Sequence, residues 1–489
     1  MDLLVSLDSQ SEAPLQRQLY ESLREAIISG RLPRGQKLPA TREFAKSLGI
    51  SRTTVTLAYE SLTTEGYIEG LTGSGTFVAT QLPDDLMRPA LRKAGAKVAD
   101  CATPKPRKLS RFGNYVRNRD FIGPVREPEI QMAVGRPDLE HFPMRQWLQL
   151  LNHHAKNKDF SALELPNQSK GYQPLRQAIA AYLARARALK ADPDQIIIVN
   201  GSQQAIDLIA RVFIEHGDAV GMENPCFYGA KAIFEAAYAR IIPVGVDDHG
   251  VIVDQLKSEL TPNLKLMYVT PSHQFPTGVA LSLPRRLELL SWANCNGSMI
   301  IEDDYDSEFR YCGRPVPALA GLDQNESVIY VGTFSKTLFV SLRLGYLLVP
   351  KPLAKTFAHA KWLTDRHTPI LEQQVLADFI SSGQFERHIR RMRAIYAGKR
   401  ETILHELQSV FGNRCEVTGD AAGINLLAKF KTRLTNEEIV EQAMNAGVSV
   451  IHAVYLDEPR HGELVMCYGG LSESDIKKGV RLLAEVIST

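Results

Sequence analysis

The sequence predicts an α/β fold in which a small N-terminal module precedes a large domain with a mostly parallel sheet. Three helical patterns and two short strand patterns occupy the first 80 residues. From about residue 126, short apolar runs alternate with longer helical segments, which is typical of a parallel sheet covered by helices on both faces. At 489 residues the chain is also long enough for two or three domains.

The composition is that of an ordinary globular protein, with 44% hydrophobic and 23% charged residues. The net charge of +2 does not by itself indicate nucleic-acid binding, so such a function has to rest on local features. The six cysteines lie far apart, which predicts reduced thiols and no metal site. We find neither a membrane-spanning apolar run nor a signal-peptide pattern at 1–11, and we therefore expect a cytoplasmic protein without a membrane partner.

The N-terminal module begins with three short helical patterns. Residues 14–29 carry apolar side chains at a helical period, and Gly30 ends that helix. Thr41 is in position to cap a second helix, which Gly49 ends, and Ser51 is in position to cap a third. Two short helices joined by a tight glycine-containing turn predict a helix-turn-helix, whose second helix reads DNA.

A β-hairpin with a glycine-rich tip is predicted at 67–78, directly after the third helix. Such a wing can lie against DNA, and the N-terminus of the preceding helix favours phosphate through its N–H groups and dipole. Many three-helix modules bind proteins instead, so the pattern alone leaves both kinds of partner open. The predicted DNA-binding residues are Thr41, Arg42, Ser51, Arg52, Thr53, Thr54, Gly73 and Gly75.

Three short motifs make this module resemble the winged helix-turn-helix of the GntR family of bacterial repressors. They are LPATR at 38–42, SRTTV at 51–55 and GSGTFV at 73–78. We assign the DNA-binding domain to 12–80. The resemblance implies that this domain binds a double-stranded DNA operator.

Five prolines and an excess of basic residues interrupt the stretch 81–125, which we predict to be a linker. A solvated tether and a contact with the DNA backbone both fit its basic character. The large domain is predicted over 126–489. Within it we expect a large subdomain at about 150–385 and a small one at about 386–489 together with 126–149.

The chemistry of the large domain centres on Lys336, a lone lysine that follows the apolar run Val328–Val331. A lysine forms an imine with an aldehyde only as the free amine, so it has to lie where its charged form is disfavoured. An arginine, Arg343, follows seven positions later. This layout predicts a pyridoxal 5'-phosphate (PLP) site with Lys336 as the Schiff-base residue and no further catalytic residue assigned. A surface lysine in a polar turn is the alternative.

Other strand ends carry side chains that suit the same cofactor. Asp303 and Tyr305 point to one face of the strand that ends in Ile301, so they can address the ring nitrogen and the phenolic oxygen of PLP. A solvated acidic loop or a Mg²⁺ site is the alternative there. Phe227 suits stacking on the ring, although a core position fits it equally. The predicted phosphate contacts are Gly201, Ser202, Gln203, Ser335 and Arg343.

The order of these pieces resembles that of fold-type I aminotransferases. The motifs are GYQPLR at 171–176, GSQ at 201–203, PSHQFPTG at 271–278, Asp303 with Tyr305, and Ser335–Lys336 with Arg343. A GntR-type head joined to such a domain is similar to the MocR subfamily. That resemblance implies a PLP-dependent transcription factor, usually a domain-swapped homodimer whose cofactor sites form between subunits.

Three positions depart from the pattern of the enzymes. Phe275 stands where aminotransferases carry an asparagine that bonds the phenolic oxygen, and Val340–Ser341 replaces a Pro-Gly pair. Val465 aligns with the arginine that binds the substrate α-carboxylate. Loss of that charged bond weakens binding by about 1.5–3 kcal/mol, so efficient transamination of amino acids is not expected.

The sequence therefore supports a PLP-dependent regulator that senses a small molecule, either PLP itself or an amine or amino acid. Val465 favours PLP or an amine without an α-carboxylate. The alternative function is a working aminotransferase with an autoregulatory DNA-binding head. A shift of one or two residues in the alignment would allow an arginine to occupy the carboxylate-binding position. A third hypothesis, an empty dimerisation scaffold, conflicts with the presence of Lys336, Asp303 and Arg343 together.

Overall fold

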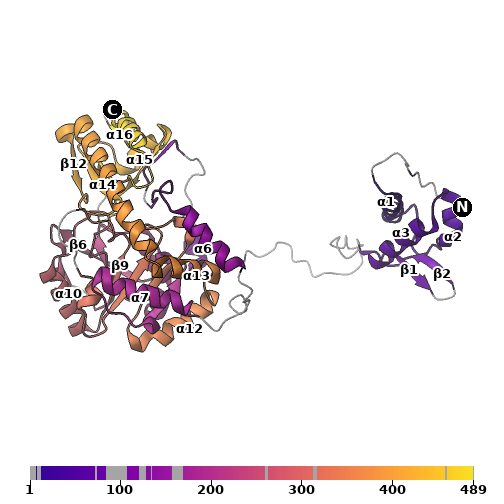
Figure 1. Cartoon of the computed structure of the whole chain (residues 1–489), viewed down its shortest axis with the longest axis horizontal. Helices are drawn as coiled ribbons and strands as arrows, with labels where there is room; N and C mark the ends of the chain where they lie inside the picture. The colour runs from indigo at the N-terminus through magenta and orange to yellow at the C-terminus, as the bar shows by residue number, and fades with distance from the viewer. Residues whose placement is uncertain are drawn as a thin grey trace. The chain divides into compact units, whose positions relative to one another are not determined.

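The computed structural model of the protein describes residues 7, 13–71, 74–83, 107–119, 128–133, 135–156, 169–258, 263–311, 317–457 and 460–487. The chain divides into two compact units, residues 1–107 and 108–489, whose elements are labelled in Figure 1. None of the helices in these described ranges is long and apolar enough to cross a membrane.

The N-terminal unit is a three-helix module followed by a two-stranded antiparallel sheet. Its elements are α1 (Leu15–Ile28), α2 (Thr41–Leu48), α3 (Arg52–Thr64), β1 (Ile68–Leu71) and β2 (Gly75–Val78). The core contains apolar residues of all three helices and of both strands, so the helices and the hairpin form one folded body. The predicted helix-turn-helix and wing are therefore both present.

The starts of α2 and α3 differ in how they are capped. Ser51 is the N-cap of α3, and its hydroxyl accepts a hydrogen bond from the Thr54 N–H at 3.1 Å. The expectation that Thr41 caps α2 is wrong, because Thr41 is already the first helical residue. Ala40 occupies the N-cap position in an extended conformation, and it has no side chain able to accept a hydrogen bond.

Replacing Ser51 with alanine should destabilise the N-terminal unit by about 0.5–2 kcal/mol, the usual loss for an N-cap serine. Faster amide hydrogen exchange in α3 of the full chain would measure this loss. Ser61→Ala is the matched control, because the Ser61 hydroxyl bonds the Leu57 carbonyl within the same helix and caps nothing. Equal exchange in both variants would contradict the capping role.

The second unit contains an eight-stranded sheet in the order β4-β11-β10-β9-β8-β5-β6-β7. The strands are β4 (Ile196–Val199), β5 (Ala219–Asn224), β6 (Arg240–Asp247), β7 (Gly250–Val251), β8 (Leu264–Val269), β9 (Met299–Asp304), β10 (Val328–Thr333) and β11 (Gly345–Leu348). The five strands from β10 to β6 pair in parallel, whereas β11 and β7 pair antiparallel with their neighbours. The expected mostly parallel sheet is confirmed.

Helices cover both faces of this sheet, as the burial of β4 illustrates. Ile196 and Ile198 pack in a core with α6, α7 and α13, whereas Ile197 and Val199 pack in another core with α8, α9 and α12. A further core lies under α10. These helices are α6 (Met144–Lys156), α7 (Gln173–Arg187), α8 (Ser202–Phe213), α9 (Tyr228–Ala236), α10 (Leu283–Asn296), α12 (Ala354–Asp365) and α13 (Ile370–Ser381). A four-residue helix, α11 (Leu319–Leu322), follows β9.

The C-terminal part forms a second, smaller α/β layer, gathered around the C-terminus in Figure 1. A four-stranded sheet in the order β12-β13-β16-β15 packs in one core with α14, α15 and α16. Residues of β3 join the same core and pair with β14. The bounds are α14 (Gln384–Phe411), α15 (Asn436–Asn445), α16 (Glu473–Ile487), β3 (Ile130–Gln131), β12 (Cys415–Thr418), β13 (Asn425–Phe430), β14 (Val448–Ser449), β15 (Ile451–His452) and β16 (Glu463–Cys467).

The region predicted to be a linker is described only in part. Residues 84–106 lie outside the described ranges, and α5 (Arg111–Arg117) packs on α9 of the second unit. The Tyr115 hydroxyl lies 3.2 Å from the Ala232 carbonyl oxygen and 2.9 Å from the Glu235 carboxylate. The boundaries 12–80, 81–125 and 126–489 stay predictions.

Candidate functional site

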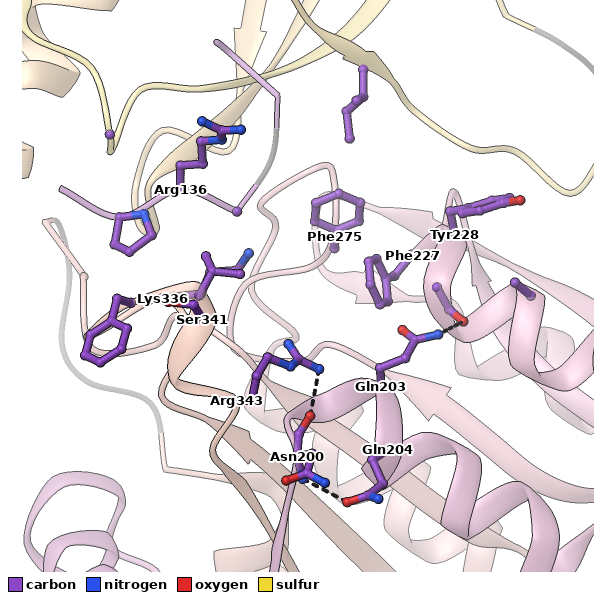
Figure 2. Close-up of a pocket in the computed structure, with 18 of the residues that line it drawn as sticks. Arg136, Asn200, Gln203, Gln204, Phe227, Tyr228, Phe275, Lys336, Ser341 and Arg343 are labelled. Atoms are coloured by element: carbon purple, nitrogen blue, oxygen red, sulfur yellow. Dashed lines mark hydrogen bonds between the residues drawn. The ribbon is translucent and has the colours of Figure 1, made fainter. Parts of the chain in front are cut away.

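A cavity of about 1510 Å³ lies at the carboxyl ends of the parallel strands. Its walls include Gln203 after β4, Phe227 after β5, Phe275 after β8 and Lys336 after β10, as Figure 2 shows. Side chains that follow neighbouring parallel strands meet at one edge of a sheet, which is where ligands bind in such folds. The topology therefore brings the predicted cofactor residues together.

Lys336 lines this cavity and is half-buried. A Cβ atom added to Gly135 would come within 2.8 Å of the Lys336 Nζ, so the bare backbone at Gly135 gives the amine its space. Burial lowers the pKa of Lys336, although the carboxylates of Asp303 and Asp306 act in the opposite direction. The surface-lysine alternative does not fit this environment. The neutral amine is the form that attacks an aldehyde, and burial favours that form.

Asp303 is a buried carboxylate in β9, with 4% of its surface exposed. Its Oδ2 accepts a hydrogen bond of 2.7 Å from the Tyr268 hydroxyl, whereas its Oδ1 is buried and has no partner among the described residues. Burial raises the pKa of Asp303 to about 7. An additional cationic donor such as a pyridinium N–H would satisfy the free oxygen and favour the ionised form.

The neighbouring carboxylates are engaged elsewhere. Asp304 Oδ2 lies 2.9 Å from Arg187 Nε and accepts a hydrogen bond of 2.5 Å from the Tyr330 hydroxyl. Asp306 lies 3.0 Å from the Nδ1 atom of His273. Because these acids are buried and paired with cations or hydroxyls, this stretch is not a solvated loop. Asp303 and Asp304 each keep one buried oxygen without a hydrogen-bond partner among the described residues, but of these two only Asp304 has a cation beside its other oxygen. Asp303 is therefore the one of the two whose charge is left for another partner to balance.

Tyr305 and Phe275 form an aromatic wall beside Asp303. The Tyr305 hydroxyl lies 3.1 Å from His273 Nδ1, so it already has a protein partner. The Phe275 ring contacts the Tyr305 ring edge-on, with centroids 6.0 Å apart. Phe275 also contacts the Phe227 ring edge-on, with centroids 5.8 Å apart. Phe275 therefore presents an apolar ring and cannot donate the hydrogen bond to the phenolic oxygen of PLP that an asparagine amide donates. A hydrogen bond from Tyr305 to the phenolic oxygen of PLP stays a prediction.

Three of the predicted phosphate contacts, Gly201, Ser202 and Arg343, meet at the N-terminus of α8. Ser202 is the first helical residue, and Gly201 before it has φ = 89°, a left-handed conformation that glycine adopts without strain. Arg343 Nη2 donates a hydrogen bond of 2.7 Å to the Asn200 carbonyl (Figure 2). A Cβ atom on Gly201 would lie 3.2 Å from that same Nη2 atom. A guanidinium beside a helix N-terminus is a site for a doubly charged anion.

The predicted cofactor residues differ in how directly they border the cavity. Gln203, Phe227, Lys336 and Arg343 line it. Gly201, Ser202 and Ser335 adjoin these lining residues along the chain, and Ser335 bonds Thr333 through its backbone N–H at 3.2 Å. Asp303 lies in β9, between β8 and β10 in the sheet, and Tyr305 directly follows that strand; neither residue appears in the cavity wall.

In the N-terminal unit, the predicted DNA-binding residues cluster at two helix starts. Thr41 and Arg42 begin α2, whereas Ser51 caps α3 and Arg52, Thr53 and Thr54 form its first turn. The side chains of Arg42 and Arg52 are exposed. Gly75 begins β2 with φ = 113°, and Gly73 lies outside the described residues. The surface has exposed arginines, and the N-terminus of α2 has no side-chain cap. Exposed cations and backbone N–H groups at a helix start are the groups that contact DNA phosphates.

Two family models and several relatives match the chain. The model of bacterial regulatory proteins of the gntR family matches residues 15–78, and the model of aminotransferase class I and II matches residues 127–483. A protein of Rhizobium meliloti described as a probable rhizopine catabolism regulatory protein MocR is 37% identical over 98% of this chain and 95% of its own length. The chain belongs to the MocR group of GntR-family transcription regulators. The regulator TauR of Rhodobacter capsulatus is 30% identical over 97% of both chains.

Solved structures support the same assignment of the large domain in this MocR-type regulator. Kynurenine aminotransferase from Pyrococcus horikoshii has a TM-score of 0.69 at 27% identity and covers 82% of this chain and 98% of its own. LysN, an α-aminoadipate aminotransferase from Thermus thermophilus, has a TM-score of 0.72 at 26% identity and covers 78% and 97%. These comparisons confirm the predicted family, the fold-type I domain, PLP as cofactor and a DNA-binding regulatory function.

Sequence reasoning missed several residues that position the site in this MocR-type regulator. Tyr268 holds Asp303, although a tyrosine inside an apolar strand gives no signal of that role. Lys361 is fully buried, and its amine donates to Gln204 at 2.9 Å, Asp365 at 2.6 Å and Thr368 at 3.0 Å. Because Gln204 belongs to the first turn of α8, this network fixes the turn that we predict to bind phosphate. The Lys361–Asp365 spacing was readable, but it is typical of an exposed helical pair.

Proposed function

We propose that this regulator holds PLP in the cavity beside Lys336 and that small molecules reaching the cofactor change its binding to DNA. Lys336 would hold the aldehyde carbon, Asp303 the ring nitrogen, and Ser202, Ser335 and Arg343 the phosphate. The observation that carries the proposal is the buried Oδ1 of Asp303, which has no partner among the described residues, close to a lysine whose pKa is lowered by burial. Both groups suit contacts with PLP. A dimerisation scaffold without a ligand would have no use for a buried unpaired oxygen or for a lysine of lowered pKa.

The residues of the chain have separate tasks in this arrangement. When bound, PLP supplies an electrophilic aldehyde that combines reversibly with primary amines. Burial lowers the pKa of Lys336 and so favours its nucleophilic, neutral form, and the Asp303 carboxylate would favour the protonated ring nitrogen. The Phe227 and Phe275 rings exclude water from one side of the cavity. The effector is accordingly PLP itself or an amine or amino acid that reacts at this position.

Communication with DNA requires two states of different affinity for the effector. We propose a domain-swapped homodimer, in which two N-terminal units over 12–80 read a double-stranded operator and the tethers over 81–125 link them to the PLP domains. A change in the arrangement of the two PLP domains would then change the spacing of the two reading helices. Helix-turn-helix dimers depend on that spacing, because each recognition helix enters its own major groove.

An active aminotransferase is the second candidate function, and the structure of β16 disfavours it. Val465 is fully buried in an apolar cluster with Phe275, Leu427 and Ala453. The strand itself, Glu463–Cys467, contains no arginine, so a shift of register by one or two residues does not place one there. The α-carboxylate anchor of the enzymes therefore has no counterpart on this strand. This absence favours the regulatory function over the aminotransferase function.

The proposed function can be tested with DNA selected by the full-length protein from a random-sequence library. Fluorescence anisotropy would compare its affinity for the cofactor-free protein, for the PLP-loaded protein, and for the loaded protein with individual amines and amino acids. We expect at least one of these additions to change the affinity by about 5–150-fold, the usual range of allosteric coupling. Unchanged affinity in all conditions would overturn the sensing function.

Arg52→Ala should weaken binding to the selected DNA by about tenfold and leave the absorbance of bound cofactor unchanged. Arg52 is exposed at the first turn of α3 and belongs to the unit that does not contain the cavity. Anisotropy titrations at several salt concentrations would also show a shallower salt dependence if Arg52 binds phosphate. Arg17→Ala on α1 is the control, and equal losses in the two variants would remove Arg52 from the interface.

A further inference from the structure

The cavity wall carries four lysine and arginine side chains among its described residues: Arg136, Lys336, Arg343 and Lys399. Three of them already have tasks. Lys336 is the amine at the centre of the site, and Arg343 bonds the turn before α8. Lys399 is buried, and its Nζ donates to Asp138 at 2.7 Å and to the Gly469 carbonyl at 2.9 Å.

Arg136 is different, because its guanidinium has no ion pair or hydrogen bond within the described part of the chain. The residue is exposed and lines the same cavity as Lys336; Figure 2 shows both side chains at one side of the cavity. An arginine is always charged and presents several donors in a fixed fork. The cavity therefore contains a cation with unused capacity to bind an anion.

The backbone around Arg136 places it between the reactive lysine and the end of β16. A Cβ atom on the preceding Gly135 would lie 2.8 Å from Lys336 Nζ. On the other side, the Cys467 thiol lies 3.8 Å from the Arg136 carbonyl oxygen, and a Cβ atom on Gly470 would lie 3.1 Å from the Arg136 Cβ. Arg136 thus adjoins the strand that lacks the carboxylate anchor.

The segment that carries Arg136 is held firmly two residues later. Asp138 is 5% exposed, and its carboxylate bonds Lys399 at 2.7 Å. Its backbone N–H donates to the Tyr396 hydroxyl at 3.0 Å. Both partners belong to α14, so the backbone near Arg136 is attached to a long helix. Only the side chain has to move to meet a ligand, which limits the entropic cost of binding.

We infer that Arg136 binds the anionic group of the effector, and that the effector is an amine that also carries a carboxylate. This inference rests on the proposed function, because the amine has to reach the cofactor at Lys336. The carboxylate would receive two parallel N–H donors from the guanidinium, a geometry that lysine does not reproduce. The anchor comes from the segment after β3 and not from β16, so the preferred separation of amine and carboxylate differs from that in the enzymes.

The test is a spectral titration of the PLP-loaded full-length protein with matched ligand pairs. Glycine is compared with methylamine, β-alanine with ethylamine, and 5-aminopentanoate with butylamine, so that each pair differs only in the carboxylate. We expect at least one amino acid to bind about tenfold or more tightly than its paired amine. That preference should disappear in Arg136→Ala, while binding of the simple amines changes little. Arg136→Lys should restore only part of it.

Arg145→Ala is the matched control, because Arg145 is exposed on α6 and does not line the cavity. Retained cofactor absorbance in every variant shows that the domain is folded and loaded. A wild-type protein that binds amines but prefers no amino acid would overturn the role of Arg136 and leave the proposed function standing. So would an unchanged preference in Arg136→Ala. If the spectrum of the wild-type protein changes with no amine and no amino acid, both the role of Arg136 and the proposed sensing of amines are wrong.

Discussion

Lys336→Ala should abolish the visible absorbance of the purified regulator and should allow PLP to be removed by dialysis. The remaining contacts to ring and phosphate are reversible, whereas the Lys336 amine is the group able to hold the aldehyde carbon covalently. Burial lowers the pKa of Lys336 and so favours its neutral amine, the form that combines with the aldehyde. Spectra before and after dialysis would measure the difference.

Peptide mapping sharpens this test. Borohydride reduction of the wild-type protein should leave a pyridoxyl group on the peptide containing Lys336. Lys351→Ala is the control, because Lys351 is exposed in the same unit and lies away from the cavity wall. A visible band that survives in Lys336→Ala, or a pyridoxyl group found on another lysine, would show that the wrong residue had been assigned.

Asp304→Asn should lower the free energy of unfolding by about 3–5 kcal/mol, the usual cost of removing one partner from a buried ion pair. Arg187 is 8% exposed and lies 2.9 Å from Asp304, so the substitution leaves its charge uncompensated in the interior. This loss is a large part of the stability of an ordinary domain. Denaturant unfolding of the cofactor-free protein would measure it without interference from PLP.

The adjacent variant Asp303→Asn should have the opposite profile. An asparagine oxygen can still accept the hydrogen bond from Tyr268, and the second oxygen of Asp303 has no partner to lose within the described residues. Stability should therefore change little, whereas PLP should dissociate much more readily because the ring nitrogen loses its anionic partner. Equal loss of PLP in the two variants would mean that Asp303 is not the carboxylate that binds the ring.

Much of the site was readable from the sequence because each of its residues follows an apolar strand. Asp303, Lys336 and the turn at Gly201 come from different strands, and parallel strands deliver such ends to one edge of a sheet. The residue types then restricted the chemistry, since a lone lysine, a carboxylate and an arginine near small hydroxyl residues fit few cofactors. The spacing along the chain carried no information about which carboxylate was already paired.

The sequence did not reveal the roles of three residues, because backbone conformation and packing, and not residue type, decide them. Thr41 satisfied the composition rule for a helix cap, but the cap is decided by backbone dihedral angles, which place the first helical residue at Thr41 itself. Lys361 and Asp365 have the spacing of an exposed helical pair, but packing buries the lysine beside Gln204. Arg136 was one of many arginines until β16 and Lys336 came to lie on either side of it.

By itself, the sequence determined the two-part architecture, the MocR group and PLP as cofactor, and it predicted Lys336 as the residue that reacts with PLP, because these depend on residue type at strand and helix ends. Only the tertiary structure decided which of the two carboxylates Asp303 and Asp304 is paired with an arginine, which lysine is buried behind α8, and which arginine remains available in the cavity. Burial and pairing arise from contacts between segments far apart in the chain, and those contacts set the charge and hydrogen-bonding capacity of every group in the site.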